Sequence, residues 1–113
     1  MDDCLFCKIV AGEIPADVVH TTERTVAFRD LNPQAPTHVL VVPRQHFANA
    51  AELAAGDPVA SAELVTTAAA VATAEGHPDD YRLVFNTGAG AGQTVFHTHL
   101  HVLGGRDLGW PPG

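Results

Sequence analysis

Basic residues are scarce in this sequence, which has 6 Lys and Arg against 13 Asp and Glu and a formal net charge of -7. Proteins that bind nucleic acids neutralise the phosphates with a broad surface of lysine and arginine. The charge balance therefore argues against DNA or RNA as a partner. A small phosphorylated ligand stays possible, because a few backbone amides and imidazoles at one place can bind an anion.

Long apolar runs are also missing. No stretch reaches the roughly 18 consecutive apolar residues that a membrane helix needs. No basic segment precedes an apolar run at the N-terminus, as a secretory signal would require. We therefore expect no membrane partner and place the protein in the cytoplasm. The 113 residues, 46% of them hydrophobic, suit one domain (residues 1–113) with a single core.

Hydrophobic patterning predicts an α+β fold with a five-stranded antiparallel sheet. The expected elements are a short N-terminal helix and one long helix, together with five strands. The helices span residues 5–10 and 58–75, and the strands span residues 16–21, 25–31, 37–42, 81–86 and 94–103. The strand at 37–42 is apolar or β-branched almost throughout, which is typical of a central strand, and Pro43 is expected to end it.

The long helix has clear signals at both ends. Asp57 is a good N-cap and Pro58 suits the first helical position, while Gly76 and Pro78 stop the helix. One stripe at helical spacing is expected to face the sheet, and its members are Val59, Ala62, Val65, Ala69 and Ala72.

Histidines alternate within the last strand, at His97, His99 and His101. Alternate strand residues share a face, so Val95 and Leu103 join the histidines while Phe96, Leu100 and Val102 face the core. His97 and His101 would then lie roughly 13 Å apart. Zinc holds imidazole nitrogens at about 2.0 to 2.1 Å, so one ion cannot bind all three, and the histidines must have at least two roles. An imidazole titrates near neutral pH, which suits a nucleophile with a proton-donating neighbour in phosphoryl or nucleotidyl transfer.

The glycine-rich loop at residues 88–94 lacks the Gly-Lys-Ser/Thr ending of a Walker loop and leads into a strand. Its backbone amides are able to converge on an oxyanion, although a flexible hairpin loop is an alternative.

Residues 97–103 (HTHLHVL) resemble the signature of the histidine triad (HIT) superfamily, and residues 104–106 (GGR) with 110–113 (WPPG) resemble its HINT branch. The similarity continues upstream through residues 92–94, 36–43 and 13–16, so it covers nearly the whole chain. The resemblance implies a HIT-like fold whose five-stranded sheets pair into a ten-stranded sheet in a homodimer. It also implies that the tail around Trp110 reaches toward the other subunit's active site.

The resemblance implies a purine nucleoside phosphoramidate hydrolase with His99 as the nucleophile that forms a nucleotidyl-histidine intermediate. His101 and His38 would contact the phosphate and orient His99. The other implied nucleotide contacts are Asn86, Thr94 and Val95 at the phosphate, with Thr94 also implied as catalytic. Asp30 is implied at the ribose, and Leu5, Phe6, Ile9, Ile14 and Leu31 are implied at the purine. Gly92 and Gln93 are further implied nucleotide-binding residues. Thr94 departs from the serine that the nearest members of the branch usually carry.

Other interpretations stay open from the residues alone. Asn86 and Asp30 are common turn residues, Phe6, Ile9 and Ile14 are ordinary core residues, and His38 suits a buried strand. The alternative functions are a dinucleoside polyphosphate hydrolase, a nucleotide-binding regulatory module with incidental catalysis, and a metalloenzyme with an ion on His99 and His101. A uridylyltransferase is disfavoured because its third triad position is typically glutamine.

The only two cysteines, Cys4 and Cys7, have the spacing of a zinc knuckle, but two thiolates are half of a tetrahedral site. Similar pairs in some bacterial HIT proteins hold zinc together with histidines that correspond here to His46 and His97. We therefore expect a structural zinc and no cofactor for catalysis. A redox dithiol and two unrelated buried thiols are the alternatives. His20 and His77 are interpreted as ordinary surface residues.

Overall fold

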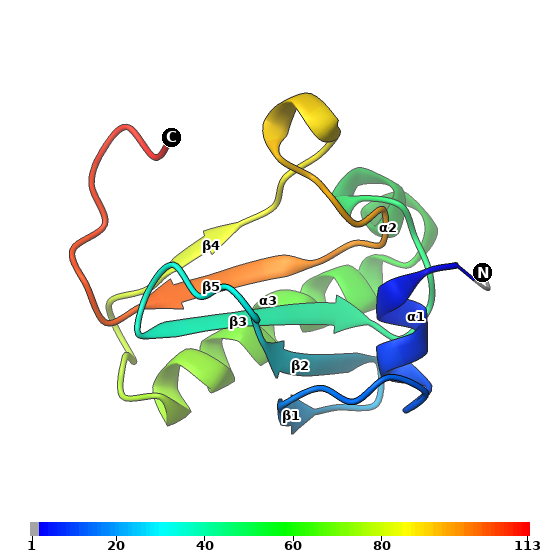
Figure 1. Cartoon of the computed structure of the whole chain (residues 1–113), viewed down its shortest axis with the longest axis horizontal. Coiled ribbons are helices and arrows are strands. Elements are labelled where there is room, and N and C mark those ends of the chain that lie inside the picture. The colour runs from blue at the N-terminus through cyan, green and yellow to red at the C-terminus, as the bar shows by residue number, and fades with distance from the viewer. Residues whose placement is uncertain (1–2) are drawn as a thin grey trace.

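Five antiparallel strands form one sheet in the order β1-β2-β3-β5-β4 in the computed structural model, which describes residues 3–113 (Figure 1). The strands are β1 (Val18–Thr21), β2 (Thr25–Arg29), β3 (Thr37–Pro43), β4 (Arg82–Val84) and β5 (Leu100–Gly104). The helices are α1 (Leu5–Val10), α2 (Ala50–Gly56) and α3 (Pro58–Ala74), with a 3-10 turn η1 (Ala89–Ala91). The predicted α+β fold is confirmed. None of the helices within residues 3–113 has the length and apolar character to cross a bilayer.

The two faces of the sheet are buried by different elements. On one face α3 covers a cluster that includes Val39, Val41 and Val102. On the other face α1 contributes Phe6 to a cluster with Phe28 and Leu40. All residues of β3 are therefore buried, as expected for a central strand. Pro43 is the last residue of that strand rather than the residue after it.

The long helix α3 begins as predicted, because the Asp57 carboxylate accepts a hydrogen bond from Ala60 N at 3.0 Å. The predicted buried stripe was wrong at Val59 and Val65, which are 57% and 46% exposed, and at Ala62, which is also exposed, whereas Ala72 is buried as predicted. The buried residues of α3 are Ala60, Leu64, Thr67, Ala68, Val71 and Ala72. Alanines on every face hide the amphipathic pattern, and the bulk of Leu64 and Val71 decides which side meets the sheet.

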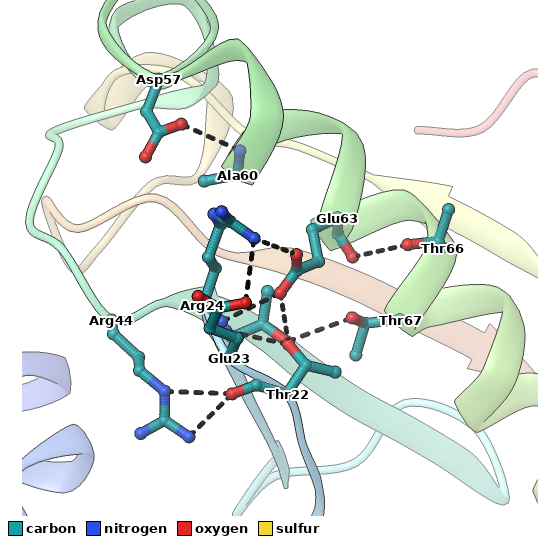
Figure 2. Close-up of polar contacts among 10 residues, drawn as sticks. Thr22, Glu23, Arg24, Arg44, Asp57, Ala60, Glu63, Thr66 and Thr67 are labelled. Atoms are coloured by element: carbon teal, nitrogen blue, oxygen red, sulfur yellow. Dashed lines mark hydrogen bonds and ion pairs between the residues drawn. The ribbon is translucent and has the colours of Figure 1, made fainter.

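Ion pairs attach both ends of α3 to the sheet. Figure 2 shows Glu63 accepting from Thr22 Oγ1 at 2.6 Å and from Arg24 N and Nη1 at 2.9 and 3.1 Å. Near the other end, Arg29 donates to both carboxylate oxygens of Glu75. Because the contacts come from the β1–β2 turn and from β2, they set the position of α3 along the sheet.

Helix α2 was not predicted, although its N-terminal signal is present in the sequence. Asn49 accepts from Glu52 N at 3.0 Å and donates to the Glu52 carboxylate at 3.1 Å, which is a reciprocal cap. A capping residue three positions before a glutamate would have identified this helix.

The predicted strand at 94–103 was wrong over its first six residues, because β5 begins at Leu100. Residues 95–97 form a bend, and Thr98 donates its amide and hydroxyl to the Phe47 carbonyl at 2.7 and 3.0 Å. The segment therefore bonds to the loop after β3 instead of to a strand. Phe96, predicted to face the core, is 53% exposed. The strands predicted at 16–21, 25–31 and 81–86 are shorter too, each by residues at its ends.

Candidate active site

Three histidines meet on the face of the sheet opposite α3. His38 lies on β3 and His101 on β5, and the register pairs Leu40 with His101, so the two histidines are diagonal neighbours. The ring centroids of His38 and His101 are 5.2 Å apart, and those of His99 and His101 are 5.1 Å apart. The chain therefore brings together the three histidines that the sequence indicated as catalytic.

The ring of His99 is held by a main-chain carbonyl. His99 Nδ1 lies 2.8 Å from the His97 carbonyl oxygen, and a carbonyl can only accept, so Nδ1 carries the proton. The neutral ring then has its lone pair on Nε2. Phe6 covers the ring edge-on with a centroid separation of 5.0 Å. This arrangement orients an imidazole with a free Nε2, which is the form that a nucleophile requires.

Burial favours the neutral form of both His38 and His101. Burial lowers the pKa of His38, although the nearby Asp30 carboxylate, 3.4 Å from His38 Nε2, acts in the opposite direction. Burial also lowers the pKa of His101 to about 4, with further lowering by His99 and His38. Within the described residues, His101 Nε2 is a buried nitrogen without a hydrogen-bond partner. A buried polar atom in this state is suited to a ligand.

A cavity of about 260 Å³ opens beside these histidines between α1, β2 and the 94–95 segment. Its walls include these residues from the predicted set: Leu5, Phe6, Ile9, Ile14, Asp30, Leu31, Thr94, Val95, His99 and His101. Phe28 and Leu40 also line it but were not predicted as site residues. Their neighbours along β2 and β3 point to the opposite face of the sheet, which α3 covers. The sequence did not show which of the two faces would carry the cavity.

Four residues predicted to contact the nucleotide lie outside the cavity walls: His38, Asn86, Gly92 and Gln93. Gln93 is buried, accepts from Gly88 N at 2.9 Å, and donates to the Ala48 and Val95 carbonyls at 2.7 and 3.1 Å. Its side chain therefore holds the 88–95 loop in place. Gly92 has a φ of +93°, a conformation that favours glycine. Asn86 follows β4 with its Nδ2 3.8 Å from the position that a Gly92 Cβ would occupy.

A larger cavity of about 580 Å³ lies between residues 77–82 and residues 105–108 and contains none of the predicted site residues. His77, which borders it, was interpreted as an ordinary surface residue, and this was wrong. It is half-buried, its Nε2 is 3.1 Å from Thr37 Oγ1, and a Cβ at Gly104 would come within 2.9 Å of its ring. Its packing against the end of β5 depends on a contact between distant segments.

Two cysteines and two histidines, Cys4, Cys7, His46 and His97, form a second cluster. The His97 Nδ1 atom is 3.4 Å from Cys4 Sγ, 3.5 Å from Cys7 Sγ and 3.1 Å from His46 Nδ1. His97 Nε2 donates to the Pro43 carbonyl at 2.9 Å, so the lone pair on Nδ1 faces the other three residues. Burial, followed by the effect of Cys4, raises the pKa of Cys7 to about 11.

The donor set of this cluster fits zinc. A tetrahedral zinc ion would separate two imidazole nitrogens by about 3.3 Å and a nitrogen from a sulfur by about 3.6 Å, given the usual bond lengths. The observed separations of 3.1 Å and 3.4 to 3.5 Å match these edges. The cluster joins α1, the loop after β3 and the 95–97 bend, and binding would release protons from the thiols.

Comparison with known proteins gives consistent matches over the whole chain. The family model of the HIT domain matches residues 11–108. The Escherichia coli K12 purine nucleoside phosphoramidase is 42% identical over 109 residues, which is 96% of this chain and 92% of that protein. An uncharacterised HIT-like protein of Synechococcus elongatus is 49% identical over 112 residues, covering 99% of this chain and 98% of that protein.

Solved structures agree. The crystal structure of a HIT family hydrolase from Legionella pneumophila has a TM-score of 0.93 at 50% identity and covers 98% of this chain and 100% of that chain. A HIT family hydrolase from Clostridium thermocellum has a TM-score of 0.91 at 42% identity, covering 96% of each chain. These matches confirm the resemblance that the histidine run indicated.

Proposed function

The chain belongs to the HIT domain family, and on that premise we propose that it hydrolyses purine nucleoside phosphoramidates through a nucleotidyl-histidine on His99. The observation that carries the proposal is the hydrogen bond from His99 Nδ1 to the His97 carbonyl, which leaves Nε2 free at the cavity. The relative in Escherichia coli, named a purine nucleoside phosphoramidase, supports the substrate class.

In the proposed complex, the purine lies between the apolar side chains of α1 and those of Ile14 and Leu31. Asp30 Oδ1 accepts from the Asn32 amide and Oδ2 lies 3.4 Å from His38 Nε2, and the remaining lone pairs of the carboxylate are assigned to the ribose hydroxyls. The α-phosphate would then lie beside His99 and His101. The Thr94 hydroxyl and the amides of Thr94 and Val95 bind its oxygens in this proposal.

The proposed chemistry begins with attack of the His99 Nε2 lone pair on the α-phosphorus. An N–P bond forms, the P–N bond of the substrate breaks, and the nitrogen of an N-protonated substrate leaves as the neutral amine. The imidazolium that results keeps its Nδ1 proton, which the His97 carbonyl stabilises. Water then attacks the same phosphorus, the His99–phosphorus bond breaks, and the nucleoside monophosphate leaves while one proton passes to solvent.

His101 and His38 support this step in the proposal without forming a covalent bond. His101 Nε2, which has no partner among the described residues and whose ring centroid is 5.1 Å from that of His99, is assigned to a phosphate oxygen. His38 contacts the opposite nitrogen of His101 at 2.9 Å and holds that ring. Gly92, Gln93 and Asn86 are assigned to shaping the phosphate loop.

We propose that Cys4, Cys7, His46 and His97 hold a structural zinc ion and that catalysis needs no cofactor. The bound ion would supply positive charge that stabilises two thiolates at neutral pH. The residues themselves link α1, which carries Leu5, Phe6 and Ile9, to the bend before His99.

The proposal is tested by acid-quenched intact mass spectrometry after brief incubation with adenosine 5'-phosphoramidate. We expect a transient mass increase of one AMP on the wild-type chain, and loss of turnover on the order of 10³-fold or more in His99→Ala. His20→Ala, which changes an exposed histidine on β1, is the matched control and should keep full activity.

Turnover that survives in His99→Ala would refute the covalent role of His99. Binding of AMP by the wild type without turnover of any phosphoramidate would support a nucleotide-binding regulatory module instead.

A further inference from the structure

A main-chain amide determines which nitrogen of His38 carries a proton. Gln34 N donates to His38 Nδ1 at 3.0 Å. An amide nitrogen can only donate, so His38 Nδ1 presents a lone pair and the proton of the neutral ring is on Nε2. The Asp30 carboxylate, 3.4 Å from Nε2, favours the same tautomer.

The same reasoning extends to His101. The proton on His38 Nε2 points along the 2.9 Å contact to His101 Nδ1, which must therefore accept. The proton of the neutral His101 ring is then on Nε2, the buried nitrogen without a partner beside the cavity. The chain of contacts thus presents one N–H group toward the position of the proposed phosphate.

Gln34 itself is held by Arg106, a residue that lies outside the cavity beside His99. Arg106 Nε donates to the Gln34 carbonyl at 2.8 Å, and Arg106 Nη1 donates to the Asp107 carbonyl at 2.9 Å. The neighbouring residues pack closely, since a Cβ at Gly105 would come within 2.9 Å of Pro36. The chain after β5 therefore holds the loop that supplies the amide.

We propose that Gln34 and Arg106 are positioning residues: the Gln34 amide, held by Arg106, keeps the His101 proton on the nitrogen that faces the phosphate. Without that amide, the His38–His101 contact can reverse, with His101 Nδ1 donating to His38. His101 Nε2 would then present a lone pair to the phosphate, and this lone pair and the phosphate oxygen would repel each other. The kinetic part of this inference rests on the proposed function, whereas the tautomers do not.

The first test needs no nucleotide and no variant. Long-range ¹H–¹⁵N spectra of the full chain labelled with ¹⁵N-histidine report which nitrogen of each ring is protonated. We expect Nε2–H on both His38 and His101 at neutral pH. A proton on Nδ1 of His101 in the wild-type chain would overturn the inference, whether or not the protein hydrolyses phosphoramidates.

The second test separates the amide of Gln34 from its side chain. Gln34→Pro removes the N–H, and Gln34→Ala keeps it. We expect Gln34→Pro to shift His101 toward Nδ1–H and to lower kcat/KM for adenosine 5'-phosphoramidate by about a hundredfold, the lower end of the range seen for loss of one donor to a developing charge. Gln34→Ala should keep the wild-type spectrum and rate. Equal behaviour of the two variants would contradict the role of the amide.

Arg106→Ala tests the same link without a change in the loop backbone, and it is decisive if the proline variant does not fold. We expect a partial shift of the His101 tautomer and a several-fold lower kcat/KM, with partial recovery in Arg106→Lys, which keeps a donor. A wild-type spectrum in Arg106→Ala would overturn the role of Arg106. Wild-type Nε2–H without any phosphoramidate turnover would refute the proposed function and leave the tautomer assignment intact.

Discussion

At the scale of single residues, main-chain groups orient the imidazoles of the site. The His97 carbonyl accepts from His99 Nδ1, and the Pro43 carbonyl accepts from His97 Nε2. Because the carbonyl accepts the proton of one nitrogen, the other nitrogen of each ring carries the lone pair. In His99 this lone pair points to the cavity, and in His97 it points to the two cysteines. One histidine segment can therefore supply a nucleophile and a metal ligand that do not compete for the same ion.

The lowered pKa of His101 predicts how stability depends on pH. The unfolded ring titrates near 6.5 and the folded ring at about 4, so between these values the unfolded chain binds more protons and stability falls as the pH falls. The full difference corresponds to about 3 kcal/mol. Urea unfolding at pH 7 and at pH 4.5 should show a loss in the wild type that is smaller in His101→Gln. An equal loss in both proteins would contradict the burial of a neutral His101.

At the scale of elements, the short helix α1 and its N-cap residue contribute to two different sites. Cys4 and Cys7 belong to the cluster with His46 and His97, while Leu5, Phe6 and Ile9 line the cavity beside His99. Phe6 packs against both His97 and His99, with centroid separations of 6.0 and 5.0 Å. An ion in the cluster would therefore stabilise the wall of the cavity as well as the bend before the nucleophile.

Metal removal is expected to destabilise the chain. Zinc-loaded protein treated with a strong chelator should lose at least about 10 °C in Tm, because structural zinc contributes directly to folding. Cys7→Ser, with a weaker ligand, should begin at a lower Tm and respond less to the chelator. Thermal unfolding with parallel metal analysis measures both. A wild-type Tm that the chelator does not change would show that the cluster is not a structural metal site.

The packing of α3 gives a second prediction at this scale. Leu64 is fully buried under the sheet, and its neighbour Val65 is 46% exposed. Leu64→Ala should lower the free energy of unfolding by about 3 kcal/mol, the usual cost of a cavity in a core. Val65→Ala is the matched control, and a surface change of this kind costs about 0.5 kcal/mol or less. Similar losses in both variants, measured by urea denaturation, would contradict the observed face of α3.

At the scale of the whole molecule, the C-terminal tail exposes a large apolar side chain, that of Trp110. Trp110 is 83% exposed, although the chain just before it is fixed by Arg82, which donates to the Leu108 and Gly109 carbonyls at 3.2 and 2.7 Å. Among the strands described, β1 and β4 are the edges of the sheet. An exposed tryptophan beside an open sheet edge is typical of an interface.

We therefore predict a homodimer in which the Trp110 tail reaches the second subunit. Sedimentation velocity at micromolar concentration should give a species of twice the 11.9 kDa chain mass. Trp110→Ala should weaken the dimer if the tail contacts the partner. A single monomeric species for the wild type across this concentration range would contradict the prediction.

Local patterns in the sequence were sufficient for most of the fold. Strand composition, turn residues and the Asp57–Pro58 start of α3 depend on residues close together in the chain. These signals predicted the five strands and both the first and the long helix. The histidine run at 97–101 likewise indicated the family. The family resemblance, rather than a local pattern, added His38 to the run and placed His46 and His97 with the Cys4–Cys7 pair, and the structure brings these residues together.

Only the tertiary structure decided which nitrogen of each histidine faces its partner and which surfaces meet. The 94–99 segment is not a strand because Thr98 bonds to Phe47 and His97 to Pro43, contacts across about half of the chain's length that no local pattern reveals. Contacts between distant segments also decide which face of α3 is buried, and they direct the Gln93 side-chain amide to the Ala48 carbonyl. Sequence periodicity reports local conformation, whereas the orientation of a side chain depends on the partners that folding brings to it.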